Sequence, residues 1–216
     1  SFSSPKINYA AGLQFNYLSS KFFYQFRVGF QEGLSDNSRF SFKRPYAPSV
    51  GYIDDTNSMS FRNPIFQGLV AYQLNKYITL SAGNEKNTFG DGYRSLWLSD
   101  FAPAYPFLKL ESTFWKVKYI NLWSLHEDQY SKGFSNLKWA SSHLLSYNVT
   151  KWMNLSVFES IVWQNKDTLV NRGPDINYFN PFVFFRPVEF GIGSADNALL
   201  GAGAKATNLR PRQCRT

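Results

Sequence analysis

The sequence has a single cysteine, Cys214, and only two histidines, His126 and His143. One thiol cannot form an internal disulfide framework or a cysteine-based metal site. The two histidines share no spacing typical of metal ligands, and the glycines do not follow the patterns of nucleotide-binding loops. We therefore expect neither a metal site nor a cofactor.

Long apolar runs are also absent. No window approaches the roughly 18 consecutive apolar residues of a membrane-spanning helix, and the mean hydropathy is −0.33. A transmembrane β-barrel would have the same average, because its strands alternate apolar residues that face lipid with polar residues that face the lumen.

Charged residues are sparse and scattered. The 23 Lys and Arg exceed the 15 Asp and Glu by 8, but the positive residues form no run or stripe. Arg210, Arg212 and Arg215 lie within the last seven residues, so the rest of the chain is only mildly basic. This distribution argues against a nucleic-acid partner.

Aromatic residues, by contrast, are abundant. The chain contains 21 Phe, 13 Tyr and 6 Trp, which together make 19% of its residues. A chain so rich in large apolar side chains does not stay disordered in water.

These aromatic residues recur at every second position. In residues 21–31, Phe22, Tyr24, Phe26, Val28 and Phe30 alternate with mostly polar residues, which predicts a β-strand with one apolar face. Four predicted hairpins join residues 8–17 to 21–31, 66–74 to 77–83, 107–114 to 117–125, and 137–149 to 152–163. Two less regular runs, 182–190 and 198–206, bring the count to about ten strands.

Short and long connections alternate along these strands. Each tight hairpin turn is followed by a long segment: residues 32–65, 84–106, 126–136 and 164–181. Transmembrane barrels have this asymmetry, with strands of about 9–11 residues against about 5–6 in soluble sheets. We therefore predict an all-β, antiparallel, up-and-down transmembrane barrel. The alternative is a soluble sandwich or lipocalin-like barrel, whose core would have to bury most of these aromatic side chains.

Several blocks resemble one known family. The segment Gly83 to Leu96 (GNEKNTFGDGYRSL), followed by Leu98-Ser99-Asp100 and by Tyr105 to Leu110, is similar to the capsule assembly Wzi family and especially to its branch linked to gliding motility. Later blocks agree with it: His143 to Val149, Phe158-Glu159, Asn180-Pro181, Phe185 to Phe190, and Asp196 to Gly201. The similarity covers residues 66–206.

The resemblance implies a non-catalytic outer-membrane barrel that holds or organises surface polysaccharide in capsule assembly or gliding motility. Its partners would be surface polysaccharide, outer-membrane lipid and other envelope proteins. It also implies more than ten strands, so we expect residues 1–207 to form part of a larger barrel. Residues 208–216 contain Pro211 and lose the alternation, and we interpret them as a truncation or frameshift product.

The connection between residues 84 and 106 is the predicted glycan-binding loop. Carboxylate, amide and guanidinium groups hydrogen-bond to sugar hydroxyls, and flat rings stack on sugar faces. Alternatively, Gly83, Gly90 and Gly92 mark turns, and an Asp91–Arg94 ion pair holds the loop down. The glycan-binding candidates are Glu85, Asp91, Tyr93, Arg94, Trp97 and Tyr105.

Three further groups of residues allow other interpretations. Pro187 would let Arg186 and Glu189 form a polar pair in the lumen. Ser141 and His143 share a strand face beside Glu159, so a lipid hydrolase is a less favoured alternative. An anion-selective diffusion channel or exporter is a second alternative, because several basic residues are predicted to face the lumen: Lys21, Arg27, Lys109, Lys118 and Lys138.

Overall fold

The computed structural model describes residues 9–34, 46–47, 51–52, 60–91, 95–100, 103–128, 136–165, 176–180 and 197–207. Within these residues the chain is all-β, with nine strands in one antiparallel sheet and two more in a small separate sheet. None of the described helices has the length and apolar character needed to cross a membrane.

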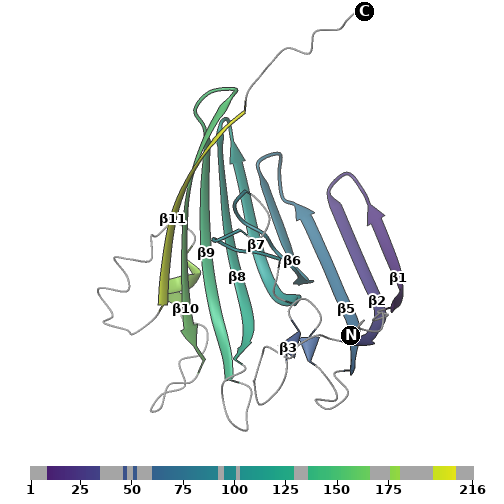
Figure 1. Ribbon diagram of the computed structural model, residues 1–216. Coiled ribbons are helices and arrows are strands. Elements are labelled where there is room, and N and C mark those ends of the chain that lie inside the picture. The colour runs from purple at the N-terminus through teal and green to yellow at the C-terminus, as the bar shows by residue number, and fades with distance from the viewer. Residues whose placement is uncertain are drawn as a thin grey trace, which may run out of the picture.

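The nine strands lie side by side in chain order, without a crossover (Figure 1). They are β1 (Tyr9–Leu18), β2 (Phe22–Leu34), β5 (Ser60–Gln73), β6 (Ile78–Glu85), β7 (Tyr105–Phe114), β8 (Val117–Asp128), β9 (Asn136–Asn148), β10 (Met153–Gln164) and β11 (Asn197–Ala206). The small sheet pairs β3 (Tyr46–Ala47) with β4 (Gly51–Tyr52). The predicted up-and-down antiparallel architecture is confirmed.

All short turns lie at one end of the sheet, the upper end in Figure 1, which we call the short-turn end. The opposite end, where the long connections start and finish, is the long-loop end. β10 pairs directly with β11 over ten residue pairs, so the alternation of short and long connections continues through the ninth strand. The predicted strand at 182–190 and the residues 208–216 lie outside the described residues.

Local side-chain chemistry sets the short turns. The Asn75 side-chain oxygen accepts hydrogen bonds from the backbone N–H groups of Tyr77 and Ile78, at 2.8 and 3.0 Å. The Thr150 hydroxyl accepts equivalent bonds from Trp152 and Met153. Asn and Thr favour turns because they satisfy backbone N–H groups in this way.

Two strands begin earlier than the runs 66–74 and 107–114 that the sequence predicts. β5 begins at Ser60 and contains Pro64, and β7 begins at Tyr105 and contains Pro106. Pro64 pairs only with β2 and Pro106 only with β6, since the ladders on their other sides start later. A proline lacks an N–H group, so it is tolerated where a strand has a neighbour on one side only.

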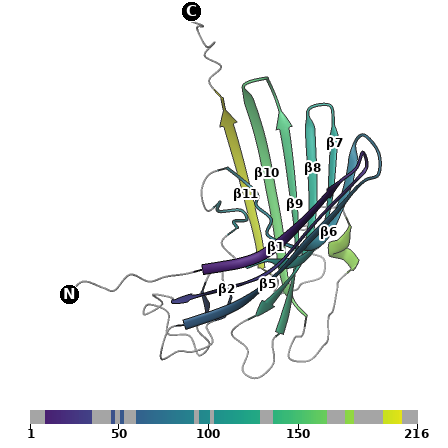
Figure 2. The same cartoon turned by 90° about the vertical axis from the view of Figure 1, so that its right-hand side faces the viewer.

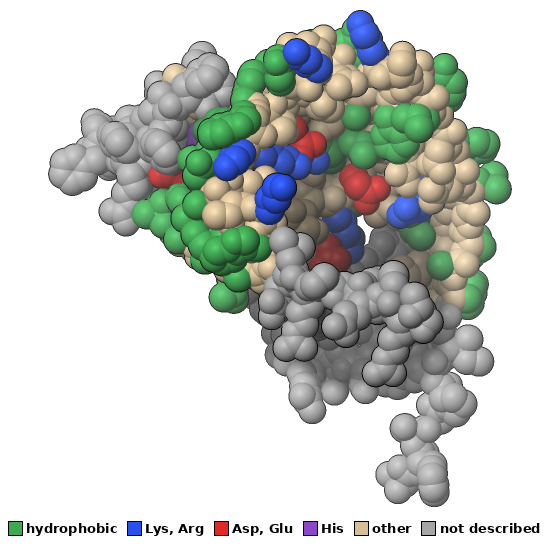
Figure 3. All heavy atoms as spheres, turned by 90° about the horizontal axis from the view of Figure 1, so that it is seen from above, with side chains coloured by type: hydrophobic (Ala, Val, Ile, Leu, Met, Phe, Trp, Pro, Cys, Tyr) green, Lys and Arg blue, Asp and Glu red, His purple; other side chains and the backbone are tan. Residues whose placement is uncertain are grey.

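The two faces of the sheet differ sharply in polarity. On the inner, concave face Arg27 donates hydrogen bonds to Gln14 at 3.2 Å and to Gln67 at 2.7 Å. On the outer face of β1, β2 and β5, large apolar side chains are exposed: Leu13, Phe15, Tyr24, Val28, Phe30, Phe66, Val70 and Tyr72. Figure 3 shows hydrophobic side chains along the outer rim, and charged side chains gathered in the hollow.

The outer face is not apolar throughout, which corrects the simple alternation expected from the sequence. Across β8, β9 and β10 it carries the polar residues Asn121, His143 and Glu159, all buried. The short 3-10 helix η1 (Ile176–Phe179) covers the neighbouring part of this face, where Tyr178 is fully buried against Trp163. Segments distant in sequence create this cover, so strand periodicity could not reveal it.

The sheet is curved and open. β1 and β11 are its two edge strands and, among the described residues, they do not pair with each other. Figures 1 and 2 show the curl of the strands, and Figure 1 shows β1 and β11 at opposite sides of the sheet. The space-filling view of Figure 3 shows the hollow that the curled sheet partly encloses.

Candidate functional site

The connection between β6 and β7 folds into the hollow and lies on the inner face of the sheet. A backbone hydrogen bond of 2.9 Å from Phe89 to Leu98 closes it into a compact loop. Its Phe89 side chain is buried in an inner-face cluster with Phe107, Ile120, Leu122 and Phe158. The loop is therefore anchored by apolar contacts on an otherwise polar face.

Trp97 fixes the loop against the last two strands. Its indole stacks on the Phe158 ring of β10, with ring centroids 5.7 Å apart and planes at 2°. It also lies flat along β11: a Cβ atom built on Gly201 would meet the indole Nε1 at 2.5 Å, and one on Gly203 would meet Cη2 at 2.8 Å. Side chains at these two positions would therefore collide with the indole.

Asp91 forms a second contact with β11. Its carboxylate accepts a charge-assisted hydrogen bond of 2.6 Å from the Lys205 ammonium group. Both side chains are more than half exposed, so the pair contributes little to stability. From the sequence, Arg94 is the expected partner of Asp91, and Lys205 is not identified. Nothing in the sequence indicates that β11 lies beneath this loop.

Of the other predicted site residues, Tyr105 belongs to the same buried cluster as Phe89. Glu85 and Tyr105 lie on strands, where they form a cross-strand pair at the base of the loop. Tyr105 is buried against the His126 ring at 4.4 Å, which corrects its expected position in the loop. Tyr93, Arg94, Arg186 and Glu189 lie outside the described residues.

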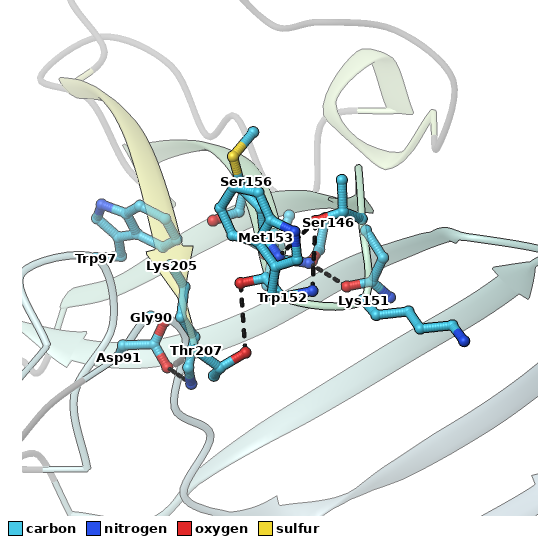
Figure 4. Close-up of a pocket in the computed structure, with 14 residues that line it drawn as sticks. Gly90, Asp91, Trp97, Ser146, Lys151, Trp152, Met153, Ser156, Lys205 and Thr207 are labelled. Carbon is cyan, nitrogen blue, oxygen red and sulfur yellow. Dashed lines mark hydrogen bonds and ion pairs between the residues drawn. The ribbon is translucent and has the colours of Figure 1, made fainter. Parts of the chain in front are cut away.

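A pocket opens beside the loop, between Gly90 and Asp91, which we call the loop tip, and the inner faces of β9, β10 and β11 (Figure 4). Its volume is about 400 Å³, and it lies toward the short-turn end of the sheet. Asp91, Trp97 and Lys205 border it, together with Trp152 from the β9–β10 turn. Of the predicted glycan-binding candidates, the structure therefore brings Asp91 and Trp97 to one pocket.

The pocket floor is built from amide and hydroxyl groups that the sequence analysis did not include among the glycan-binding candidates. Asn148, Asn154 and Lys205 form one row across three strands, and Ser146 and Ser156 form the next. The Asn154 amide donates hydrogen bonds of 2.8 Å to Asn148 and to Ser146. The alternating polar residues of two strands were the available signal, but their register with β11 was needed to place them together.

The inner-face cations expected to favour a channel are mostly engaged. Lys118 pairs with Glu111 at 3.0 Å and Lys109 pairs with the same carboxylate at 3.7 Å. Arg27 is held between two glutamine side chains. Glu111 offsets one of the two lysine charges, and the glutamines orient Arg27 without neutralising it, so this part of the inner face stays mildly basic.

The predicted proximity of Ser141, His143 and Glu159 is confirmed, since His143 pairs directly with Glu159 across β9 and β10. However, the Ser141 hydroxyl is fully buried on the outer face and donates a 2.8 Å hydrogen bond to the Tyr178 carbonyl. The hydroxyl's hydrogen is thus committed to a carbonyl oxygen, which disfavours a nucleophilic role.

Comparison with protein-family models, with curated proteins and with solved structures gives no match. The family resemblance of residues 66–206 therefore remains a prediction.

Proposed function

We propose that this chain forms the membrane-embedded sheet of an outer-membrane protein that binds and organises surface polysaccharide without chemically converting it. Support comes first from the outer face, where large apolar side chains of three adjacent strands are exposed together. Exposed apolar surface of this extent is typical of a membrane or protein interface. The long antiparallel strands and the short turns gathered at one end favour the membrane.

The proposed ligand rests on the loop in the hollow, which is the observation that carries the function. The loop places an indole and a carboxylate beside a floor of amide and hydroxyl groups. Flat rings and neutral hydrogen-bonding groups are the chemistry by which proteins hold sugars. The resemblance to the capsule assembly Wzi family points to the same class of ligand, with a role in capsule attachment or gliding motility.

Retention of polysaccharide on cells tests this proposal. We expect cells that produce Trp97→Ala, alone or with Arg94→Ala, to shed surface polysaccharide that wild-type cells retain. Leu96→Ala is the matched control, because Leu96 is on the same loop and 94% exposed. Undiminished retention in the Trp97→Ala strain, with normal amounts of protein in the outer membrane, would overturn the proposal.

The mildly basic inner face favours a second candidate, an anion-selective channel or exporter. The loop opposes it, because it lies on the inner face within the hollow. Glu111 also offsets one of the two neighbouring lysine charges. Single-channel recordings of the purified protein in planar bilayers separate the two functions, since only the channel gives anion-selective conductance.

A further inference from the structure

We infer that the pocket between the loop tip and β9–β11 is a subsite for one neutral sugar unit of the polysaccharide, held by the Asn148–Asn154 pair beside Trp97 and Trp152. This inference rests on the proposed function, and it adds the residues, the charge class of the sugar and the end of the barrel at which the sugar is held.

The size and shape of the pocket suit a small polar ligand. Its volume of about 400 Å³ lies within the range of about 300–1,000 Å³ found for small-molecule sites. Three separate segments of the chain wall it: the loop tip, the β9–β10 turn and the edge strand β11. Figure 4 shows Trp97 and Trp152 among the side chains that line it.

Hydrogen-bonding capacity is available on the floor. The Asn148 side-chain oxygen accepts a bond from Asn154, while its two amide N–H groups have no partner within the described part of the chain. Asn154 in turn exchanges hydrogen bonds with Ser146, which fixes the orientation of its amide. An oriented amide pair can donate to one sugar hydroxyl and accept from another, which is how neutral polyols are recognised.

The charges near the pocket favour a neutral ligand. Asp91 and Lys205 lie 2.6 Å apart and neutralise each other. Lys151 is the remaining cation among the described lining residues, and Figure 4 shows its side chain extending away from the others. An acidic sugar or a phosphate would have to compete with the Asp91 carboxylate for Lys205, so charge does not select for one.

The position of the pocket indicates the side of the membrane on which the sugar is held. It lies beside the β9–β10 turn, at the short-turn end, whereas the loop starts and finishes at the opposite end. Short turns face the periplasm in bacterial outer-membrane barrels. In the proposed orientation the sugar unit is therefore held at the periplasmic mouth of the hollow.

Titration of the purified full-length protein in nanodiscs tests the subsite. The probes are the surface polysaccharide of the source cells, N-acetylglucosamine and galactose as neutral sugars, and glucuronic acid and inorganic phosphate as anions. Calorimetry and tryptophan fluorescence provide the binding readouts. We expect neutral sugars to bind, and Asn148→Ala and Asn154→Ala each to weaken polysaccharide binding by about tenfold, the equivalent of one well-made hydrogen bond.

Asn16→Ala is the matched control, because Asn16 is an inner-face amide on β1, at the far edge of the sheet. If the wild type binds polysaccharide and both pocket variants bind it equally well, the subsite is wrong while the proposed function stands. A preference for glucuronic acid or phosphate over the neutral sugars overturns the charge class. If the wild type binds no polysaccharide, the proposed function itself fails.

Discussion

At the scale of single residues, the position of the loop depends on small side chains opposite a large one. The Trp97 indole covers Gly201 and Gly203, and the absence of side chains there lets the ring lie flat against β11. The stacked Phe158 ring from β10 supplies the neighbouring apolar surface. The shape of the Trp97 indole therefore matches the flat surface that the two glycines leave on β11.

Replacing one of these glycines should displace the loop. In Gly203→Val, the new side chain would collide with the indole, because even a Cβ atom would lie 2.8 Å from Cη2. Overpacking of this kind costs about 1–3 kcal/mol. We expect Gly203→Val to lower the midpoint of thermal unfolding on heat-modifiable gels and to expose the loop to protease.

Ala202→Val is the control, because Ala202 is adjacent on the same strand and exposed on the opposite face. Equal protease sensitivity of both variants would mean that Trp97 does not hold the loop.

At the scale of one element, β2 carries the contrast between lipid-facing and lumen-facing sides in its clearest form. Phe22, Tyr24, Val28 and Phe30 are exposed on one side, while Gln25 and Arg27 face the hollow. If lipid lies against the even positions, a charge there has no partner and no water. If water lies there, the same charge hardly changes the free energy of unfolding.

Substitution by lysine distinguishes these environments. We expect Val28→Lys, near the middle of the strand, to destabilise the protein in liposomes by about 2–4 kcal/mol, as a lysine at the bilayer midplane does. Gln25→Lys on the inner face should cost much less. Equilibrium unfolding in denaturant measures both values, and equal small effects would argue for a water-facing outer surface.

At the scale of the whole molecule, the sheet has two distinct ends. Lys151 is exposed at the short-turn end, and Asp100 is exposed in the β6–β7 connection, whose flanking strands end and begin at the long-loop end. The proposed function places the first in the periplasm and the second toward the cell exterior. The two positions should therefore differ in their access to reagents that cannot cross the outer membrane.

Cysteine labelling tests this orientation in a Cys214→Ser background. We expect Asp100→Cys to react with a membrane-impermeant maleimide on intact cells. Lys151→Cys should react only after the outer membrane is permeabilised. The reverse pattern would invert the proposed topology and move the pocket to the cell surface.

Much of the architecture could be predicted from local patterns. Alternation with a period of two located both strands of each hairpin, and residues such as Asn75 and Thr150 marked the turns. The predicted starts of β5 and β7 came after Pro64 and Pro106, whereas both prolines lie within the strands. A strand tolerates a proline where no neighbouring strand needs its N–H. That information is in the pairing of strands, not in the strand itself.

The candidate site was predictable only in part. Asp91 and Trp97 were identified from the chemistry of their loop, but their partners Lys205, Phe158 and Gly203 were not. These contacts join segments that are far apart along the chain. Their register follows from the whole sheet, and no local window contains it.

The sequence by itself determined the class of fold, the number and direction of the hairpins, and the opposite character of the two strand faces, because each depends on neighbours within a few residues. Only the tertiary structure decided where the long connections go. One lies in the hollow and builds a pocket with β9–β11, and another packs η1 on the outer face against Trp139, Ser141 and Trp163. Such placements depend on contacts between distant segments, whose free energy is decided by shape and burial after the sheet has formed.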